Sequence, residues 1–371
     1  MPSLEGGKEF SSNRLRSKVD MKALLLVGGK GTRLRPLTVH TPKSIVPIFN
    51  RPFLLYQIDL LKQIPEIDEI ILSLNYQPRR IEELFGDGKE LGIKLRYVVE
   101  PTPLGTAGAV RYAGESLTDS VVVFNGDVMT QIDLAAVIAL HRQRKALATI
   151  VLTPVENPSA YGLVEADAEG NVRRFLEKPK PEEITCNTIN AGIYVLEPSS
   201  FGRIPREMAW SIERSFFPSL VERGETFVSY VSKGYWIDIG TLDKYVKVHR
   251  DIMNGLYVAP PFSNGRGTTA IVESGARVEP GAEIIGPVYI DEGASVKTGA
   301  RIGPYSVVGR HCQVEEGAVI HGSILWPNTR VSRDARIQDS VLGRGCFVGQ
   351  DASVENCILG DKSEITEFSR L

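Results

Sequence analysis

An aliphatic residue recurs at every sixth position in the C-terminal part of the chain. Val and Ile hold eight successive positions in one phase, from Val278 to Ile320. Beyond Ile320 the repeat becomes seventeen residues long, as in Ile320, Ile337 and Val354. In a left-handed parallel β-helix, each of the three faces of a coil takes about six residues and turns one aliphatic side chain into the core. We therefore predict a left-handed β-helix over residues 270–371.

Residues 21–250 follow a different pattern, in which short apolar runs alternate with helix-like stretches. Predicted strands cover 21–27, 70–74, 95–99 and 120–124, and predicted helices cover 53–62, 79–85, 106–116 and 133–144. Buried strands that alternate with helices are typical of an α/β domain, here a Rossmann-like, mostly parallel sheet covered on both faces. Residues 251–269 are rich in Gly, Pro, Ser and Asn and are interpreted as a linker, and residues 1–20 as a flexible extension.

Charge and hydropathy exclude several classes of protein. The 43 Lys and Arg residues and the 45 Asp and Glu residues leave a net charge of −2, without the basic excess of nucleic-acid-binding proteins. No apolar run approaches the ~20 residues of a membrane-spanning helix, and the N-terminal segment lacks the apolar centre of a secretory signal. We therefore expect a cytoplasmic protein that binds neither nucleic acid nor a membrane. Its four cysteines show no metal-binding spacing and are expected to be reduced.

The first predicted strand leads into a glycine-rich turn at residues 28–33, with the sequence GGKGTR. In an open α/β sheet, ligands bind at the carboxyl ends of strands, where glycines let backbone N–H groups approach phosphate oxygens. The turn matches neither the Walker pattern nor the dinucleotide pattern GxGxxG, so it favours neither an ATPase nor a dehydrogenase. A glycine-rich turn alone also suits a tight connection, but the nearby Arg33, Arg35 and Lys43 favour a polyphosphate ligand.

These residues resemble the opening of the sugar-1-phosphate nucleotidyltransferases, or NDP-sugar pyrophosphorylases. The resemblance begins with LLLVGGKGTRLRPLT and TPKSIVPIFNRP and continues, in the family's order, through EPTPLGTAGA, FNGDV, YGLVE, FLEKP, NAGIYVL and YWIDIGT. Many members also carry a C-terminal β-helix of hexapeptide repeats. The resemblance implies nucleotidyl transfer from an NTP to a hexose 1-phosphate, with release of pyrophosphate. The nearest group is the mannose-1-phosphate guanylyltransferases, which make GDP-mannose, and the glucose-1-phosphate uridylyl- and thymidylyltransferases are the alternative.

The resemblance implies that cations and a metal ion carry the reaction. A sugar 1-phosphate, with a second pKa of about 6, is already a nucleophile at pH 7, so no general base is required. Arg33 would stabilise the triphosphate and the leaving pyrophosphate, Lys43 would bridge the reacting phosphates, and Lys178 would hold the sugar phosphate. Asp127, which follows a predicted strand and counts among the catalytic residues, would bind Mg²⁺ together with Asp238.

The remaining predicted contacts divide between the nucleotide and the sugar. The nucleotide-binding residues that the resemblance implies are Leu26, Gly28, Gly29, Gly31, Thr32, Glu100, Pro103, Gly105 and Thr106. The sugar-binding residues are Tyr161, Gly162, Glu177 and Asn190. Glu100 stands where relatives specific for uracil or thymine tend to have glutamine. Because a carboxylate accepts both adjacent N–H donors of guanine, Glu100 favours GTP, and the competing interpretation is a solvated acid at a strand end.

Two other classes of function share this architecture. A catalytically silent regulatory subunit would be expected to lose one of the catalytic cations or metal-binding carboxylates, and this chain keeps all of them. A bifunctional enzyme would use the β-helix as an acyltransferase with His311 or His321 as base, but the β-helix carries no evident acyl-carrier signature. The exposed faces and aliphatic core of the β-helix instead suggest assembly into a homo-oligomer.

Overall fold

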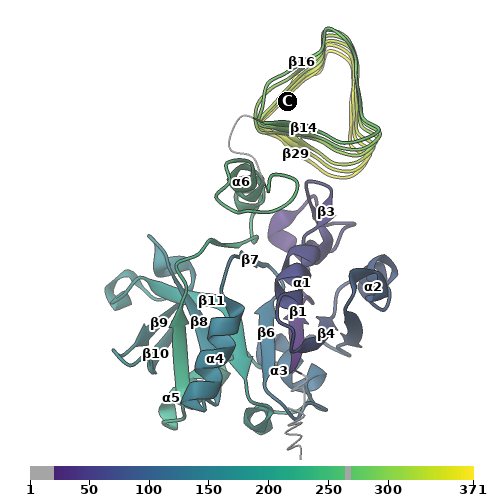
Figure 1. The fold of residues 1–371 in the computed structure, drawn as a ribbon. Coiled ribbons are helices and arrows are strands. Elements are labelled where there is room, and N and C mark those ends of the chain that lie inside the picture. Colours follow the sequence, from purple (N-terminus) through teal and green to yellow (C-terminus); the bar gives the residue numbers. More distant parts are fainter. Residues whose placement is uncertain (1–20, 264–268) are drawn as a thin grey trace, which may run out of the picture.

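The computed structural model describes residues 21–263 and 269–371 (Figure 1). The predicted extension at residues 1–20 and part of the predicted linker, residues 264–268, lie outside this range. An α/β domain comes first, helix α6 (Leu242–Met253) follows it, and a coil of short strands forms the C-terminal region. Viewed along its axis, this coil is a triangle stacked on α6 (Figure 1). None of the helices in the described residues is long and apolar enough to cross a bilayer.

The N-terminal half of the central sheet is parallel, and its elements confirm the predicted α/β domain. They are β1 (Met21–Leu26), α1 (Leu54–Lys62), β4 (Ile67–Leu74), α2 (Pro78–Phe85), β5 (Lys94–Val99), α3 (Gly105–Ala113), β6 (Val121–Asn125) and α4 (Leu134–Arg144). Strand β1 lies between β4 and β6, and β5 pairs with β4. The chain therefore leaves β1 toward one side of the sheet and returns on the other side at β6. A crevice at such a reversal is the usual ligand position in open α/β sheets.

The C-terminal half of the sheet is largely antiparallel and is built around β11. Its elements are β8 (Ala148–Pro154), β9 (Gly162–Ala166), β10 (Val172–Glu177), β11 (Thr188–Leu196), α5 (Phe217–Glu222) and β12 (Phe227–Val231). Strand β11 pairs antiparallel with β6, β8 and β9, whereas β12 runs parallel to β8. The register of β11 against β8 is interrupted between Asn190 and Tyr194. Asn190 therefore lies at an irregularity, and such irregularities bend a strand locally.

Side chains of the parallel strands alternate between two buried clusters, one on each face of the sheet. Leu25 and Phe124 belong to the cluster that contains the apolar residues of α1, α2 and α4. Their neighbours Leu24 and Val123 belong to the cluster that contains those of α3 and α5. This period of two, together with helices on both faces, explains why the strands are apolar along their whole length.

Two short pairs of strands lie outside the central sheet. Strand β7 (Val128–Thr130) pairs antiparallel with β13 (Trp236–Asp238), and β2 (Pro47–Ile48) pairs antiparallel with β3 (Arg51–Pro52). Asp238 lies opposite Val128 in the first pair. This pairing brings Asp238 beside the loop that follows β6, although more than a hundred residues separate the two in the sequence.

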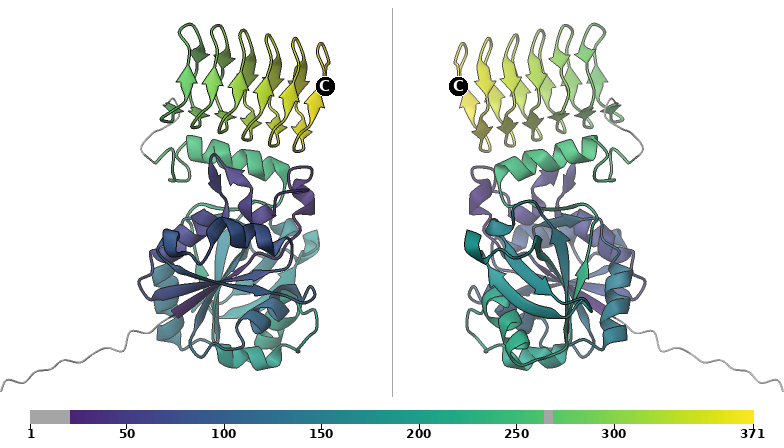
Figure 2. Two further views of the ribbon diagram at one scale, coloured as in Figure 1. Left: turned by 90° about the vertical axis from the view of Figure 1, so that its right-hand side faces the viewer. Right: turned by 90° about the vertical axis from the view of Figure 1, so that its left-hand side faces the viewer.

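The C-terminal region is a parallel β-helix of three sheets, which confirms the predicted repeat (Figure 2). The first sheet contains β14 (Ala270–Val272), β17 (Val288–Ile290), β20 (Ser306–Val308), β23 (Ile324–Leu325), β26 (Val341–Leu342) and β29 (Ile358–Leu359). The second contains β15 (Arg277–Val278), β18 (Ser295–Val296), β21 (Gln313–Val314), β24 (Arg330–Val331), β27 (Phe347–Val348) and β30 (Glu364–Ile365). The third contains β16 (Glu283–Ile284), β19 (Arg301–Ile302), β22 (Val319–His321), β25 (Arg336–Gln338) and β28 (Ser353–Glu355). Repeat residues such as Val296, Ile302 and Val308 are buried inside the coil.

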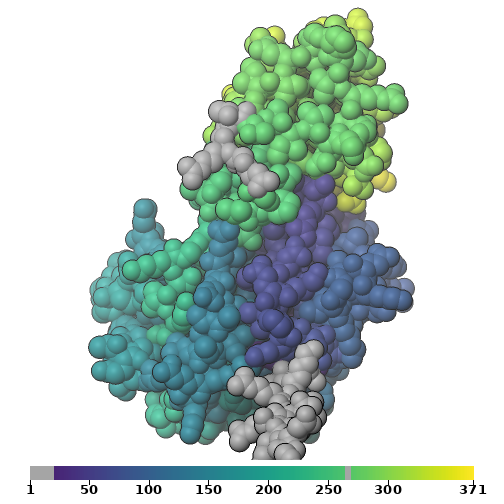
Figure 3. Space-filling view, viewed as in Figure 1, coloured from purple at the N-terminus to yellow at the C-terminus, as the bar shows by residue number. Residues whose placement is uncertain are grey.

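Helix α6 lies between the α/β domain and the first sheet of the β-helix (Figure 2). The space-filling view shows the β-helix seated on the α/β domain (Figure 3). Tyr289 and Trp326 on the outer face of this sheet share one buried cluster with Tyr245 of α6 and with Phe49 of the α/β domain. Trp326 Nε1 donates to Tyr245 Oη over 2.9 Å, and Tyr245 Oη donates to the carbonyl oxygen of Pro47 over 2.6 Å. The β-helix is therefore packed onto the α/β domain through a continuous core.

Candidate active site

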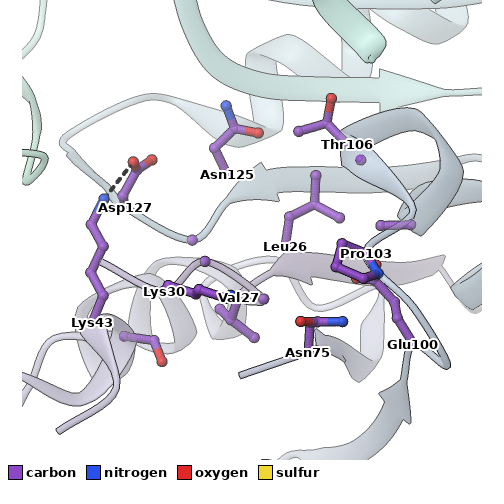
Figure 4. Close-up of a pocket in the computed structure, with 16 residues that line it drawn as sticks. Leu26, Val27, Lys30, Lys43, Asn75, Glu100, Pro103, Thr106, Asn125 and Asp127 are labelled. Atoms are coloured by element: carbon purple, nitrogen blue, oxygen red, sulfur yellow. Dashed lines mark hydrogen bonds and ion pairs between the residues drawn. The ribbon is translucent and has the colours of Figure 1, made fainter. Parts of the chain in front are cut away.

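A pocket of about 370 Å³ opens at the carboxyl ends of β1 and β6 (Figure 4). Its lining includes seven of the predicted nucleotide-binding residues, namely Leu26, Gly28, Gly29, Glu100, Pro103, Gly105 and Thr106. The predicted catalytic residues Lys43 and Asp127 also line it. The other lining residues are Val27, Lys30, Ser44, Asn75, Ala109, Asn125 and Gly126. The predicted residues Gly31, Thr32 and Arg33 continue the glycine-rich turn beyond the lining.

Close packing explains two glycines of this turn. A Cβ on Gly28 would lie 3.1 Å from the Cβ of Asn75, and a Cβ on Gly31 would lie 2.9 Å from the Cβ of Lys43. Gly31 also has a φ of +62°, which favours glycine. Gly29 differs, because a Cβ there would meet no atom within 4 Å. The turn therefore packs against Lys43 and leaves open space at Gly29, where a phosphate group has room to approach the backbone.

Lys43 and Asp127 form an ion pair at one end of the pocket (Figure 4). Lys43 Nζ donates to Asp127 Oδ2 over 2.7 Å, and the side chains are 13% and 30% exposed. Burial opposes ionisation of Asp127, but the charge and hydrogen bond of Lys43, with the charge of Arg33, outweigh it and lower the pKa of the carboxyl group. Asp127 is therefore an ionised carboxylate at neutral pH, as a metal ligand must be.

Gln57 of α1 holds the loop that carries Asp127. Its Nε2 donates to the carbonyl oxygen of Asn125 over 2.9 Å and to that of Val128 over 2.8 Å, one on each side of Asp127. Gln57 is only 2% exposed, so these bonds are shielded from water. Gln57 belongs to no motif of the sequence, and a polar residue within a helix gives no sign of facing inward.

Asp238 lies among two cations and a tyrosine. Tyr161 Oη donates to Asp238 Oδ1 over 3.2 Å, and Lys244 Nζ donates both to Asp238 Oδ1 and, over 2.7 Å, to Tyr161 Oη. A Cβ on Gly240 would lie 2.9 Å from Arg33 Nη2 and 2.9 Å from Asp238 Oδ2, so the Arg33 guanidinium also lies on this side of the site. Lys244 was not among the predicted site residues.

The two predicted metal ligands occupy neighbouring positions in the fold. Asp127 directly precedes β7, Asp238 ends β13, and Ile239 N donates to the carbonyl oxygen of Asp127 over 2.8 Å. Carboxylate oxygens are donors that suit Mg²⁺, which usually takes its other ligands from water and substrate phosphates. Within residues 21–263 and 269–371, no group of three or more His, Cys, Asp or Glu side chains could hold a metal by itself. Two neighbouring carboxylates have the donor chemistry that Mg²⁺ prefers.

The predicted sugar-binding residues lie outside the lining of the pocket, around the ends of β9 and β10. Lys178 follows β10 with a φ of +52°, and its N–H donates to the carbonyl oxygen of Tyr161 over 3.0 Å. A Cβ on Gly162 would lie 3.1 Å from Glu177 Oε2, so glycine lets the two strands approach here. Burial raises the pKa of Glu177, and the nearby carboxylate of Glu213 raises it further.

Asn190 lies on β11, where its side chain is engaged within its own strand. Its Nδ2 donates to Tyr194 Oη over 2.9 Å, and its Oδ1 accepts from Gly192 N over 2.9 Å. These bonds fix the amide plane at the strand irregularity. A sugar hydroxyl at Asn190 would therefore share atoms that already have partners.

The segment around Trp210, which belongs to no sequence motif, packs against the start of α3. Trp210 accepts a backbone hydrogen bond from Ala107 over 2.9 Å, and a Cβ on Gly105 would lie 2.8 Å from the same Trp210 oxygen. Thr106 Oγ1 donates to Glu213 Oε2 over 2.9 Å and accepts from Ile212 N over 2.8 Å. Ile212 begins a π-helical turn (Ile212–Phe216), a form often found at functional sites. Glu213 therefore links the pocket at Thr106 to the region of Glu177.

Glu100 is buried at the end of the pocket away from Asp127 (Figure 4). Its Oε1 accepts from Ser73 Oγ over 3.2 Å, and its Oε2 accepts from Leu104 N over 2.9 Å. Burial outweighs these two bonds and raises the pKa of the carboxyl group above its ordinary value. Glu100 is only 9% exposed, which does not fit the interpretation of a solvated acid.

Comparison with known proteins places the chain in a family. The family described as Nucleotidyl transferase matches residues 22–255, and the one described as GMPPB C-terminal domain matches residues 284–370. The chain therefore belongs to the nucleotidyl transferase family, with the C-terminal domain that the second match describes. Within that family it is a sugar-1-phosphate nucleotidyltransferase.

Curated relatives match most of the chain. Mannose-1-phosphate guanylyltransferase of Mycobacterium tuberculosis is 40% identical over 80% of this chain and 82% of its own length. A probable mannose-1-phosphate guanylyltransferase 2 of Arabidopsis thaliana is 39% identical over 85% of this chain and 84% of its own. The UTP–glucose-1-phosphate uridylyltransferase of Synechocystis is 32% identical over 86% of both chains.

A solved structure of HddC from Yersinia pseudotuberculosis, complexed with GMP-PN, resembles this chain with a TM-score of 0.53 and 28% identity. The match covers 62% of this chain and 99% of the HddC chain.

Proposed function

We propose that this protein transfers a guanylyl group from GTP to mannose 1-phosphate, forming GDP-mannose and pyrophosphate. The observation that carries this proposal is the 36–40% identity, over most of the chain, to relatives named mannose-1-phosphate guanylyltransferase. The solved structure of a similar protein with GMP-PN agrees with a guanine nucleotide. The buried carboxylate of Glu100 in the pocket offers guanine an acceptor for its adjacent N–H donors.

In the proposed reaction, an oxygen of the sugar phosphate attacks the α-phosphorus of GTP. The new bond joins that oxygen to the α-phosphorus, the bond from the α-phosphorus to the bridging oxygen breaks, and its electron pair leaves with pyrophosphate. No proton has to be removed, because the phosphate monoester is largely dianionic at neutral pH. The protein's part is to align two anions and to neutralise their charge. Lys43 and Arg33 act on the triphosphate and the leaving group, and Lys178 holds the sugar phosphate.

Asp127 and Asp238 are the proposed ligands of Mg²⁺. When bound, this ion would supply Lewis-acid neutralisation of the phosphate charge. Each carboxylate is paired with a lysine, Asp127 with Lys43 and Asp238 with Lys244. The two ammonium groups balance the carboxylates, so that the pairs place no excess negative charge where the phosphates would bind.

The remaining proposed contacts are those that the sequence predicts. The nucleotide would contact Leu26, Gly28, Gly29, Gly31, Thr32, Glu100, Pro103, Gly105 and Thr106. The hexose would contact Tyr161, Gly162, Glu177 and Asn190. Close approach at Gly28 and Gly162 supports a role for these glycines, because a side chain at either position would crowd its neighbours.

The uridylyl or thymidylyl alternative rests on the 32% identical uridylyltransferase of Synechocystis. An acyltransferase role for the β-helix has less support. The rings of His311 and His321 lie beside Gly293 and Gly303, and both histidines are exposed on the surface of the β-helix, as ordinary surface residues are.

A substrate panel tests the proposal. The protein is incubated with Mg²⁺, with each of four NTPs and each of three hexose 1-phosphates, and pyrophosphate release is measured. We expect the highest kcat/KM for GTP with mannose 1-phosphate. A higher value for UTP or dTTP with glucose 1-phosphate would replace the guanylyl assignment, and no turnover with any pair would indicate a silent subunit. Acetyl-CoA turnover is measured in parallel for the acyltransferase alternative.

We also propose a cytoplasmic homo-oligomer that is joined through the β-helix. The proposal is supported by the end strands β14 and β29, each of which is paired on one side only among the strands of the described residues. Sedimentation of the purified protein would give the subunit count. A monomer at cellular concentration would overturn the assembly role.

A further inference from the structure

Lys244 connects two parts of the site that lie far apart in the sequence. Its ammonium group donates to Asp238 Oδ1 and, over 2.7 Å, to Tyr161 Oη. It also lies 4.9 Å from the centroid of the Tyr161 ring, within cation–π range. Tyr161 in turn packs edge-on against Trp236 at a centroid distance of 5.6 Å. One ammonium group thus holds a proposed metal ligand and a proposed sugar contact in a single arrangement.

The position of Lys244 in its helix is unfavourable for helix stability alone. Thr241 is the N-cap of α6, so Lys244 is the third residue of the helix. Backbone N–H groups concentrate positive charge in the first turn, where Asp and Glu are stabilising and Lys is not. The ion pair with Asp238 offsets this penalty, and it gives a reason for a lysine here that the helix itself does not supply.

We propose that Lys244 is a positioning residue that holds Tyr161 against Asp238. The bound hexose 1-phosphate is thereby aligned with the carboxylate of Asp238, a proposed metal ligand. This inference rests on the proposed function and deepens it. Without the ammonium group, the Tyr161 hydroxyl keeps only its own bond to Asp238, at 3.2 Å. The sugar side of the site would then lose its alignment, while the nucleotide side, whose pocket lining does not include Lys244, would not.

The residue next to Lys244 anchors the same turn of α6 from the opposite direction. Tyr245 is buried, and its Oη joins the carbonyl oxygen of Pro47 to the indole of Trp326 in the β-helix. The first turn of α6 is therefore held between the active site and the β-helix. This anchoring of the helix turn explains how the Lys244 side chain keeps a defined position although it is 28% exposed.

Three variants test the proposal. Lys244→Met keeps an unbranched apolar side chain and removes the charge, whereas Lys244→Arg keeps a cation that can bridge both partners. Lys247→Met is the matched control, because Lys247 lies one turn later, is 59% exposed and pairs with Asp251. Steady-state kinetics use whichever NTP and hexose 1-phosphate give the highest turnover in the substrate panel. Binding of the hexose 1-phosphate is also measured by calorimetry.

For Lys244→Met we expect KM for the hexose 1-phosphate and its dissociation constant to rise about tenfold, as for the loss of one charge-assisted hydrogen bond. KM for the NTP should stay within about twofold, Lys244→Arg should recover most of the loss, and Lys247→Met should match the parent. Equal changes in both KM values, or no change in sugar binding, would overturn the positioning role. A different preferred substrate pair would overturn the proposed function but not this inference, because the test uses the pair that the protein prefers.

Discussion

The α/β domain and the β-helix both bury parallel strands, but they pair strands over different distances in the sequence. In the β-helix, Ile320 lies opposite Ile337, one short coil later. In the α/β domain, Lys22 of β1 lies opposite both Glu69 and Val121. Loops from remote parts of the chain therefore meet at one edge of the central sheet, whereas the loops of the β-helix form rows along its corners. This difference explains why the predicted reactive side chains lie in the α/β domain, while the β-helix provides packing surface.

One sheet of the β-helix departs from this division. Its inner face contributes Val288 and Leu325 to the core of the coil, and its outer face contributes Tyr289 and Ile324 to the core shared with α6. This sheet is buried on both sides, like the strands of the α/β domain. The two regions thus have different folds but share one buried core.

Removing the β-helix should have the largest effect. A chain that ends near Gly265 exposes Phe49, Tyr245, Val248 and Ile252, which now lie in the shared core. Full burial of such side chains contributes about 1.5–3 kcal/mol each, so their sum approaches the 5–15 kcal/mol that stabilises a typical domain. We expect a lower melting temperature and a changed subunit count, although the catalytic motifs are intact. A truncated protein as stable as the parent, with the same subunit count, would show that the two regions are independent.

Substitutions of the proposed metal ligands test whether the α/β domain carries the chemistry. Asp127→Asn and Asp238→Asn should each reduce kcat about 10²-fold or more without unfolding the protein, because they weaken the electrostatic clamp on the phosphates. Asp243→Asn, on the exposed side of the first turn of α6, is the matched control and should stay near the parent rate. Rates are measured at limiting and at saturating Mg²⁺. A near-parent rate at limiting Mg²⁺ would remove that residue from the metal site.

Acid should weaken the packing of α6 on the α/β domain, beneath the β-helix, through His249. Phe49 N donates to His249 Nε2 over 3.1 Å, so the proton of the neutral ring is on Nδ1, which donates to the carbonyl oxygen of Tyr245 over 2.9 Å. Burial lowers the pKa of His249 from 6.5 to about 4. Between these values the unfolded state binds a proton that the folded state does not. Stability is therefore fully present above about pH 6.5 and falls by up to about 3 kcal/mol as the pH approaches 4.

Chemical denaturation between pH 4 and pH 7 measures this contribution of His249. His249→Gln, which keeps a polar side chain without the titrating ring, should flatten the pH dependence by the same amount. Identical slopes for the parent and the variant would show that other groups account for the acid sensitivity.

The smallest expected effect concerns the choice of base. Glu100→Gln replaces a carboxylate with an amide that presents one acceptor and one donor, which suits uracil or thymine better than guanine. We expect the preference for GTP over UTP and dTTP to fall by about 1–3 kcal/mol. The kcat/KM values for the three nucleotides, with mannose 1-phosphate and glucose 1-phosphate, are compared in parent and variant. An unchanged ratio would mean that backbone groups near Leu26 and Gly28 select the base instead.

Features that depend on short-range interactions could be predicted from the sequence alone. The six-residue repeat specified the β-helix, because each coil closes with its neighbour and needs one aliphatic side chain per face. The apolar runs located β1, β4, β5 and β6, and the glycine-rich turn after β1 located one wall of the pocket. These signals are local, so they can be read from spacing and residue type alone.

Contacts between side chains that are far apart in the sequence became visible only in the folded structure. Gln57 holds the Asp127 loop through two backbone carbonyls, and Lys244 joins Asp238 to Tyr161 from the first turn of α6. Neither residue belongs to a motif, because nothing in a helix sequence tells which distant loop its polar side chain will contact. The outer face of β14 to β29 is a similar case: the repeat predicts the inward residues, but the partner of Tyr289 and Trp326 appears only when α6 packs on them. Convergence of this kind follows from sheet order and packing, which the periodicity of a sequence does not encode.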